Sequence, residues 1–292
     1  MSYQGNITLV NFNTTNKATG KTQAYSDYTI TDSTKVIQNK NYNLTVNLNT
    51  DNGNYEYFSN VWIDWNQDAD FEDTDEKYIL GSTTNNTNGA TNLSPLTISI
   101  PNHALVGATR MRVSCKYSDQ PDVCSNGFDG EVEDYKIIVV AEPNLSLAVN
   151  KNSFCLGEKV KFSYTGSALD NLSWTISNGL NTFTSTNFSD SLVLLNTGTY
   201  NISISTNFLG QNYTFDSVAV FKVFGPNSFT LNNSSCNPTD TGVFVQTLTN
   251  VNGCDSVLTT ITSFQNFDTL TIYKTSCLEI EIGTKIDSSG QL

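Results

Sequence analysis

Short runs in which hydrophobic and polar residues alternate recur along the whole chain of 292 residues. Alternation with a period of two is typical of a β-strand that buries one of its faces. No window of about 12 residues repeats apolar positions at the i, i+3, i+4 and i+7 spacing of an amphipathic helix. The pattern therefore predicts an all-β protein made of tandem antiparallel β-sandwich modules, Ig-like or jelly-roll-like, with a small disulfide-containing β repeat at the C-terminus.

Turn residues and prolines divide the chain into segments. In the first segment, 1–141, Asn, Asp, Gly or Pro bound seven strand-like runs, at 7–12, 25–30, 42–48, 60–64, 96–100, 109–116 and 134–140. This spacing predicts an antiparallel sandwich. A boundary follows at Pro143, because proline has no N–H to donate to a sheet. Five further runs and the lone Trp174, expected in the core, predict a second sandwich over 144–224.

An internal repeat marks the rest of the chain. The sequence TLNNSSC that ends at Cys236 aligns with TIYKTSC that ends at Cys277, an offset of 41 residues. A glycine lies six residues after each of these cysteines. The pattern predicts a Cys-containing β repeat at 225–266 and a truncated second copy at 267–292, which stops just before the counterpart of Cys254. The chain is therefore expected to be part of a longer array.

The composition argues against several classes of protein. With 15 Lys+Arg against 28 Asp+Glu and a sequence pI near 4.3, the chain lacks the basic face that binds nucleic acids. Its apolar runs fall far short of the roughly 20 residues of a membrane span. The N-terminus has no signal-peptide pattern, so we expect a removed export signal or a fragment. With one histidine, His103, the sequence predicts no enzyme of the Ser-His-Asp or Cys-His type.

Cysteine usage indicates an oxidising compartment, outside the cell or at its surface. Six cysteines occur without a CxxC pair and without neighbouring histidines, which favours disulfides over metal–thiolate sites. Proximity along the chain predicts the pairs Cys115–Cys124 and Cys236–Cys254. The pairing of Cys155 and Cys277 stays open.

The strongest chemical signal is an acidic run directly after the strand at 60–64. Seven carboxylates lie between Asp64 and Glu76, with no base before Lys77. Like charges about 4 Å apart repel by about 4 kcal/mol at an effective dielectric near 20, so the cluster is unfavourable unless it binds a cation. Acidic or amide side chains fall at positions 1, 3, 5, 7, 9 and 12 of a calcium loop, of which Glu72 is the ninth. The predicted Ca²⁺ ligands are Asp64, Asn66, Asp68, Asp70, Asp75 and Glu76.

This loop departs from an EF-hand in three respects. Position 6 is Ala69, where a glycine normally provides the positive φ, and position 12 is Asp75 instead of glutamate. The loop also follows a strand instead of a helix. The alternative is a solvated acidic turn that binds no ion.

A second acidic group, DGEVEDY at 129–135, opens the last strand of the first segment. Alternation places Glu131 and Glu133 on one face of that strand and Asp134 on the other. We interpret the stacked pair Glu131 and Glu133 as acceptors for backbone groups or for Arg110 and Arg112, or, together with Asp134, as further ligands of the calcium loop. Acid/base catalysis would require a sugar-binding cleft, for which the sequence gives no sign.

Several motifs together resemble the GEVED domain, namely VWIDWNQD at 61–68, GATRMRV at 107–113 and GEVEDY at 130–135. The resemblance covers nearly all of residues 1–140. It implies an ancillary module of large secreted or cell-surface proteins of Gram-negative bacteria that use the type IX export route. With Trp174, the turn at Asn178-Gly179 and GTYNISI at 198–204, residues 144–224 resemble a PKD-like Ig-type module. With NPTDTG at 237–242 and GCDS at 253–256, the Cys-containing segment resembles repeats of giant adhesins from those bacteria.

These features predict a non-catalytic fragment of a secreted or cell-surface multi-domain protein, whose calcium-stabilised β modules act as an adhesin stalk or spacer. The alternative is a carbohydrate- or protein-binding module ancillary to a secreted hydrolase. Its ligand, a glycan or a surface protein, would stack on Tyr57, Trp62 and Trp65. A hydrolase that uses Glu131, Glu133 or Asp134 is the third hypothesis.

Overall fold

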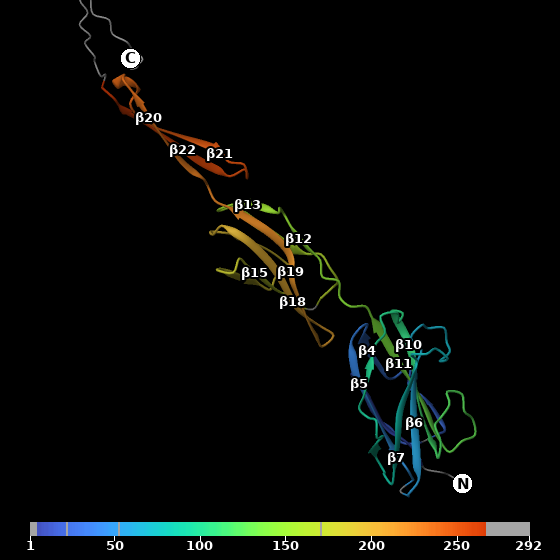
Figure 1. Ribbon diagram of the computed structural model, residues 1–292. Coiled ribbons are helices and arrows are strands. Elements are labelled where there is room, and N and C mark those ends of the chain that lie inside the picture. The colour runs from blue at the N-terminus through green and yellow to red at the C-terminus, as the bar shows by residue number, and fades with distance from the viewer. Residues whose placement is uncertain (1–4, 22, 52, 170, 267–292) are drawn as a thin grey trace, which may run out of the picture. The chain divides into compact units, whose positions relative to one another are not determined.

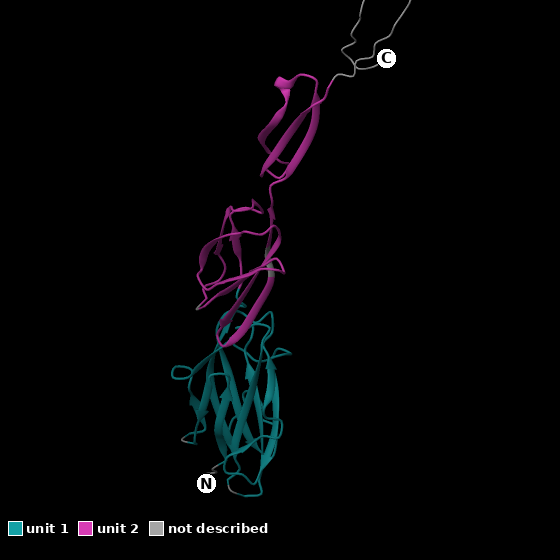
Figure 2. Ribbon diagram, turned by 90° about the vertical axis from the view of Figure 1, so that its left-hand side faces the viewer, with its two compact units in different colours: residues 1–143 teal, residues 144–292 magenta. Residues whose placement is uncertain are grey.

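The structure, a computed structural model, describes residues 5–266 except residues 22, 52 and 170. It divides into two compact units, residues 1–143 and 144–292, which are coloured separately in Figure 2. Within the described residues the regular structure is all strand, apart from the 3₁₀ turn Pro238–Asp240, so the predicted all-β class is confirmed. No helix found there has the length and apolar character needed to cross a membrane.

Unit 1 contains two sheets, drawn from blue to green in Figure 1. The first has the order β2-β1-β5-β8, and β9 also pairs with β5; its strands are β1 (Asn6–Phe12), β2 (Thr15–Ala18), β5 (Asn41–Asn49), β8 (Gly89–Ala90) and β9 (Leu96–Ser99). The second has the order β3-β11-β10-β6-β7, and β4 also pairs with β11; its strands are β3 (Tyr25–Asp27), β4 (Ser33–Ile37), β6 (Glu56–Ile63), β7 (Lys77–Thr84), β10 (Gly107–Tyr117) and β11 (Gly130–Val140).

One hydrophobic core joins the two sheets of unit 1. Alternate residues of β5, such as Leu44 and Val46, are fully buried, and so are alternate residues of β10, such as Met111 and Val113. All four belong to the same buried cluster, so the inner faces of the sheets pack against each other. Each such aliphatic side chain stabilises the fold by about 1.5–3 kcal/mol.

Unit 2 contains a sandwich of two sheets and a separate third sheet. The orders are β12-β14-β17, β13-β19-β18-β15-β16 and β20-β22-β21. The strands of the sandwich are β12 (Leu147–Val149), β13 (Ser153–Cys155), β14 (Lys159–Tyr164), β15 (Ser173–Ser177), β16 (Thr182–Ser185), β17 (Ser189–Val193), β18 (Gly198–Phe208) and β19 (Gln211–Phe224). Those of the third sheet are β20 (Ser228–Ser235), β21 (Gly242–Thr249) and β22 (Asp255–Phe264).

Trp174 on β15 anchors the core of the sandwich, as predicted. Its side chain is fully buried, its indole Nε1–H donates to the Asn187 carbonyl at 2.6 Å, and its ring meets Phe162 edge-on at 5.1 Å. A buried indole needs such a partner for its N–H. Trp174 is therefore a core residue and offers no stacking surface.

The third sheet has no comparable core. Phe229, Val243 and Phe244 are each more than 60% exposed, and of its described residues only Cys254 and Ser256 are buried. A three-stranded sheet normally needs a covered hydrophobic face to be stable. This sheet therefore depends on its connection to the sandwich.

The predicted disulfide between Cys115 and Cys124 is wrong, because both residues are free thiols. Cys115 lies on the inner face of β10, fully buried in the core. Cys124 is exposed in the loop that follows β10. Backbone carbonyls of this loop accept hydrogen bonds from Asn60 and Arg112, which lie on the outer face of the sheet. The sheet itself separates the two thiols.

The predicted pair Cys236–Cys254 is wrong for a topological reason. Among the described residues one disulfide is present, Cys155–Cys254, and Cys236 is an exposed free thiol. Strands β20 and β22 run parallel; Cys236 follows the end of β20, whereas Cys254 precedes the start of β22. Opposite ends of strands of this length are more than about 20 Å apart. Cys277 and the predicted second copy of the repeat, 267–292, lie outside the described residues.

Candidate metal centre

The acidic loop 64–76 connects two neighbouring antiparallel strands, β6 and β7, so both of its ends are fixed. Trp62 pairs with Lys77 in the register of these strands, and the Ile63 N–H donates to the Glu76 carbonyl at 2.9 Å. The Asp64 N–H donates to the Arg110 carbonyl of β10 at 3.1 Å. The sheet therefore holds the first and last carboxylates of the loop in place.

Between these ends, short polar side chains fold the loop back on itself. The backbone N–H groups of Asp68, Asp70 and Glu72 each donate to the side-chain oxygen two residues earlier, at 2.9–3.1 Å. These are successive Asx-type turns, which Asn and Asp favour. Ala69 adopts a φ of +74°, the positive value expected at the sixth position of a calcium loop. This backbone conformation is less favourable for alanine than for glycine.

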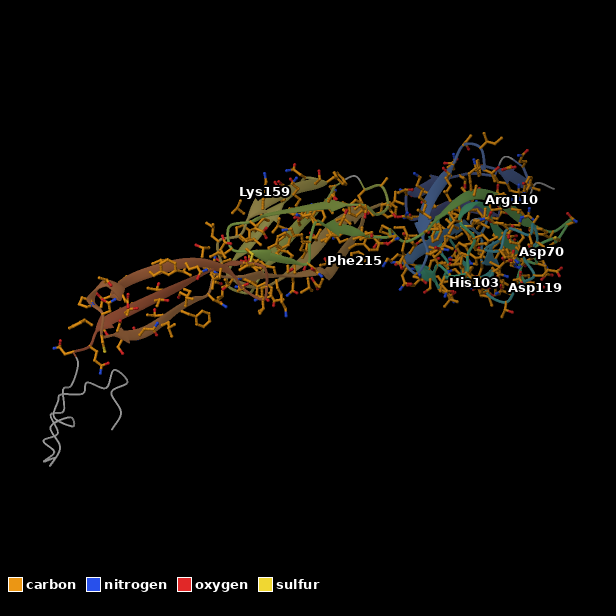
Figure 3. All side chains as sticks on the ribbon, turned by 90° about the horizontal axis from the view of Figure 1, so that it is seen from above. Asp70, His103, Arg110, Asp119, Lys159 and Phe215 are labelled. Atoms are coloured by element: carbon orange, nitrogen blue, oxygen red, sulfur yellow. A yellow bond between two sulfur atoms is a disulfide. The ribbon has the colours of Figure 1, made fainter. Side chains whose placement is uncertain are left out.

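Three exposed carboxylates meet in this loop. Asp68, Asp70 and Asp73 each place an oxygen within 4.8 Å of the others. The Asn66 amide donates to Asp68 Oδ2 at 2.8 Å and to Asp73 Oδ2 at 2.6 Å, so it lies in the same cluster. Asp70, labelled in Figure 3, belongs to this group. Three negative charges at this spacing repel one another, and a divalent cation would remove that repulsion.

Two buried carboxylates lie at the ends of the same loop. Glu76 is 1% exposed; its Oε1 accepts the Trp65 N–H at 2.7 Å, and its Oε2 has no hydrogen-bond partner among the described residues. Asp64 is 7% exposed; its Oδ2 accepts the Ala69 N–H at 3.3 Å, and its Oδ1 is likewise unpartnered in that part of the chain. Leaving a buried carboxylate oxygen unpaired is costly.

The electrostatics of Glu76 connect the buried and the exposed carboxylates. Burial raises the pKa of Glu76, and the negative charges of Asp64 and Asp73 raise it further, against backbone hydrogen bonds that lower it. The charges of Asp64 and Asp73 therefore act on the buried Glu76 carboxylate. Carboxylate and amide oxygens are the ligands that Ca²⁺ prefers, whereas softer metals prefer sulfur or imidazole.

The structure brings together most, but not all, of the predicted ligands. Asp64, Asn66, Asp68, Asp70 and Glu76 all have the positions just described. Asp75 is directed elsewhere, since its Oδ2 lies 3.0 Å from His103 Nε2. Asp73 was not predicted, because the twelve-residue spacing assigns no ligand to the tenth position. The folding back of the loop through its Asx turns is what places Asp73 beside Asp68.

Glu131 and Glu133 do not lie beside this loop. In the register of the sheet, Glu131 pairs with Cys115, and Cys115 pairs with Ser59 on β6. Asp64 follows Ser59 by five residues, which corresponds to about 16 Å at 3.3 Å per residue. Glu133 is in register with Val113 and Val61, two strands away from β6 and about 10 Å from Asp64 along the strand direction. Both glutamates are fully buried on the inner face of β11. We therefore place them in the core of unit 1 and not around a metal.

The two glutamates have unusual electrostatics for a protein core. Glu131 Oε2 accepts the Ile7 N–H at 3.1 Å, and Glu133 Oε2 accepts the Tyr135 hydroxyl at 2.7 Å, while the Oε1 atom of each has no partner among the described residues. Burial raises the pKa of both carboxyls to about 7, and the Glu133 charge adds to the effect on Glu131. Because neither is accessible to a substrate, catalysis by this pair has no structural support.

Asp134, on the opposite face of β11, has a structural role. Its side chain is fully buried and accepts hydrogen bonds from Arg112 Nε at 2.8 Å and Nη2 at 2.9 Å, from Arg110 Nη1 at 3.1 Å and from the Tyr25 hydroxyl at 2.9 Å. Bidentate arginine–carboxylate pairs are strong and orient both groups. The arginine contacts that the sequence suggested for Glu131 and Glu133 are therefore made by Asp134 instead, whereas the alternative, a backbone donor, is found at Glu131.

The aromatic residues considered for ligand stacking are inside the protein. Tyr57, Trp62 and Trp65 are each at most 2% exposed, and the Trp65 indole Nε1–H donates to the Tyr78 hydroxyl at 2.9 Å. A sugar ring could not reach their faces. The proposed stacking surface is therefore not formed by these residues.

Comparison with protein families bears on this part of the chain. Residues 58–138 match the model of the GEVED domain. The matched GEVED segment runs from β6 to β11, so it contains the acidic loop, Asp134 and the glutamate pair. No curated protein matches the chain.

Several solved structures resemble the chain loosely. They include the three N-terminal domains of the outer capsid protein Hoc of bacteriophage RB49 (13% identity, 68% of this chain and 61% of that one, TM-score 0.28). Others are an I-band fragment of titin (7%, 80% and 95%, TM-score 0.35) and a bacterial ice-binding adhesin (11%, 89% and 98%, TM-score 0.33). The match spans less than two thirds of the phage chain. At these TM-scores the likeness carries no argument about function.

Proposed function

We propose that unit 1 is a calcium-binding β module and that the chain is a non-catalytic part of a longer secreted or cell-surface protein, where its modules act as a spacer. The observation that carries the calcium proposal is the meeting of Asp68, Asp70 and Asp73 within 4.8 Å. The two ends of their loop hold buried carboxylates, each with an oxygen that has no hydrogen-bond partner among the described residues. Ca²⁺ takes six to eight oxygen ligands, and this loop offers that kind of donor set.

The ion would act by joining the exposed part of the loop to its fixed ends. Asn66 and the three exposed carboxylates would bind it from one side, and Asp64 and Glu76 would contribute from the sheet. An ion that binds only the folded state stabilises it by about 2.7 kcal/mol at one hundred times its Kd. Calcium would therefore stiffen unit 1, which suits a module exposed to an extracellular medium.

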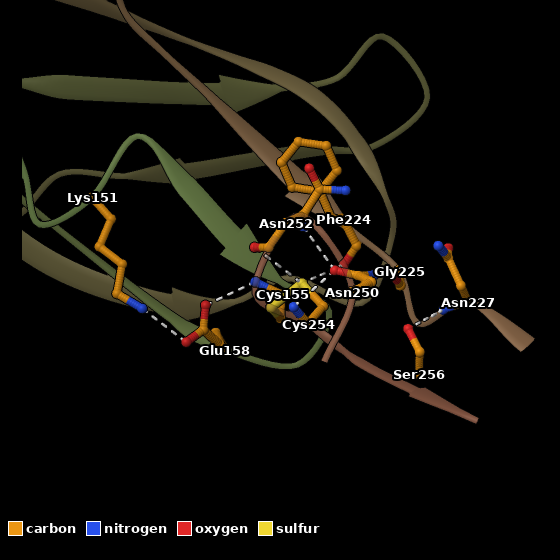
Figure 4. The surroundings of a disulfide bond; sticks show 10 residues. All are labelled: Lys151, Cys155, Glu158, Phe224, Gly225, Asn227, Asn250, Asn252, Cys254 and Ser256. Atoms are coloured by element: carbon orange, nitrogen blue, oxygen red, sulfur yellow. Dashed lines mark hydrogen bonds and ion pairs between the residues drawn. A yellow bond between two sulfur atoms is a disulfide. The ribbon is translucent and has the colours of Figure 1, made fainter. Parts of the chain in front are cut away.

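Two further observations support a location outside the cell. The Cys155–Cys254 disulfide (Figure 4) is a bond that persists in oxidising compartments. The match of residues 58–138 to the GEVED domain supports the resemblance to ancillary modules of secreted or cell-surface bacterial proteins. We further propose export by the type IX route, beside PKD-like modules and adhesin repeats. The alternative, a carbohydrate- or protein-binding module, would need a surface other than Tyr57, Trp62 and Trp65, because these are buried.

Calorimetric titration of Ca²⁺ into the full chain, together with thermal unfolding in EDTA, tests the proposal. We expect one ion per chain and a lower Tm of unit 1 in EDTA. Asp68→Asn should weaken binding at least tenfold and remove the Tm shift. Asp119→Asn is the matched control, because it removes the same charge from another exposed loop of unit 1. No binding, or equal binding by both variants, would refute the calcium site.

A further inference from the structure

A hollow of about 560 Å³ lies at one end of the sandwich in unit 2. Its lining residues come from the place where β15 begins, β18 ends and β19 begins, and these three strands are neighbours in one sheet. Phe215, labelled in Figure 3, directly follows one of the lining residues on β19. Binding sites for small ligands usually measure roughly 300–1,000 Å³. The hollow therefore has room for a ligand of this size.

The strand register places three hydroxyl groups side by side in this hollow. Ser173 of β15 is opposite Ser205 of β18, and Ser205 is opposite Thr214 of β19. The adjoining residues Trp174 and Ile204 are buried in the core, so alternation directs the three hydroxyls to the outer face of the sheet. None of the three makes a hydrogen bond to another of the described residues. The hollow thus presents a row of hydroxyls that a ligand can reach.

Three asparagine side chains line the same hollow and hold one another in place. Asn171 Oδ1 accepts the Asn207 backbone N–H at 3.0 Å, and Asn212 Oδ1 accepts the Asn207 side-chain amide at 3.0 Å. Asn207 Oδ1 in turn accepts the Gly210 N–H at 3.1 Å, in the turn between β18 and β19. Within the part of the chain that the structure describes, the Nδ2 groups of Asn171 and Asn212 have no acceptor. Two positioned amide donors therefore accompany the row of hydroxyls.

The chemistry of the lining selects the kind of ligand. All lining residues are uncharged, although the chain as a whole has a net charge of −13. A charged ligand would find no partner for its charge there, and leaving a charge unpaired is unfavourable. The two apolar side chains of the lining, Leu172 and Tyr213, are 3% and 7% exposed, so the hollow offers no large exposed anchor of the kind that protein interfaces use. Hydroxyl and amide groups suit a neutral ligand that is itself rich in hydroxyls.

We propose that this hollow binds a neutral glycan, a short chain of hexose or N-acetylhexosamine units without carboxylate or sulfate groups. The hydroxyls of Ser173, Ser205 and Thr214 exchange hydrogen bonds with sugar hydroxyls, and the amides of Asn171 and Asn212 donate to sugar oxygens. A free polysaccharide and the glycan of a glycoprotein offer the same chemistry. This binding role goes beyond the spacer role proposed for the chain, and it does not depend on calcium in unit 1.

A glycan microarray probed with the full chain tests the class of ligand. The array carries neutral hexose and N-acetylhexosamine oligosaccharides, free and as glycopeptides, beside sialylated, sulfated and uronate-containing glycans. We expect binding to neutral glycans that is unchanged between about 0.05 and 0.5 M NaCl, because no ion pair contributes to it. EDTA should not affect it either. Binding to acidic glycans alone, loss of binding in high salt or in EDTA, or no binding to any neutral glycan would overturn the proposal.

Two variants of the full chain test whether the hollow is the binding site. Ser205→Ala combined with Thr214→Val removes two hydroxyls and keeps the size of the outward side chains nearly unchanged. Asn212→Asp keeps the oxygen that accepts from Asn207 and replaces the amide donor by a second acceptor oxygen. Each variant should weaken the binding of the array's strongest neutral glycan at least about fivefold in calorimetric titration, because hydrogen bonds to the ligand are lost.

The matched control is Ser203→Ala combined with Thr199→Val. It makes the same kinds of change at outward positions of β18 that do not line the hollow. The control should bind the glycan like the parent chain, and all variants should unfold at the parent's Tm, which excludes loss of the fold as the cause of weaker binding. Equal affinity in the hollow variants and the control would overturn the proposal.

Discussion

The buried pair Glu131 and Glu133 should make unit 1 less stable as the pH rises through the weakly acidic range. The pKa of each carboxyl is about 7 in the folded protein, against 4.5 for an ordinary glutamate. A pKa difference of 2.5 corresponds to roughly 3 kcal/mol for one group. Lys21 near Glu131, and Lys17 with the Tyr135 hydroxyl near Glu133, already reduce these shifts.

The sign follows from proton binding by the two states. Below about pH 4.5 the folded and unfolded states both hold the protons. Between about pH 4.5 and 7 the unfolded chain loses them first, so the folded state binds more protons and its free energy of unfolding falls as the pH rises. Above about pH 7 both states are ionised and this contribution no longer changes. Replacing Glu131 by Gln should therefore flatten the profile and stabilise unit 1 at pH 8.

Urea unfolding at pH 5, 6, 7 and 8 measures this effect. The Trp174→Phe background removes the tryptophan of unit 2, so that the fluorescence reports on Trp62 and Trp65 of unit 1. The control is Glu56→Gln, which changes an exposed glutamate of the same unit and should leave the slope unaltered. A free energy of unfolding of unit 1 that rises from pH 5 to 8 would refute the reasoning. So would a Glu131→Gln variant whose free energy of unfolding falls with pH as steeply as that of the parent protein.

Three further predictions concern single contacts. Trp174→Ala should lower the free energy of unfolding of unit 2 by about 3–5 kcal/mol in urea; a loss below about 1 kcal/mol would contradict its core role. Asp134→Asn should destabilise unit 1 by about 3–5 kcal/mol, because it leaves Arg112 without its charged partner; a Tm equal to that of Asp119→Asn would argue against this. Reduction of the Cys155–Cys254 disulfide, whose cysteines are 99 residues apart in the sequence, should lower the free energy of unfolding of unit 2 by up to about 4–5 kcal/mol in calorimetry. The same reducing treatment should not change the free energy of unfolding of the Cys155→Ser variant.

The fold could be predicted where alternation is strong. Strands β5 and β10 alternate strictly between buried and exposed positions over much of their length, and the sequence places both. Strand β7 was missed because Leu80 is its only fully buried residue, so the strand carries almost no periodic signal. The disulfide could not be predicted from proximity, since the parallel pairing of β20 and β22 decides which cysteines can meet.

The acidic loop could be predicted in composition but not in shape. Alternate Asp and Asn residues identify the Asx turns and most of the carboxylate cluster. The sequence cannot show that Asp75 turns toward His103 while Asp73 turns toward Asp68 and Asp70, because that depends on how the loop folds back. Nor does it show the strand register, which places Glu131 and Glu133 away from the loop.

The carboxylates of unit 1 show why charge in a sequence does not by itself identify a site. Asp134 has two arginine partners, which satisfy its charge inside the protein. Glu131 and Glu133 have no arginine partner among the described residues, and burial raises the pKa of both carboxyls, so they hold their protons to a higher pH. The loop carboxylates have neither arginine partners nor a closed core around them, and they remain open to solvent at Asp68, Asp70 and Asp73. Of the three groups, only the loop carboxylates therefore carry negative charges that the protein does not neutralise and that a cation from solution can reach.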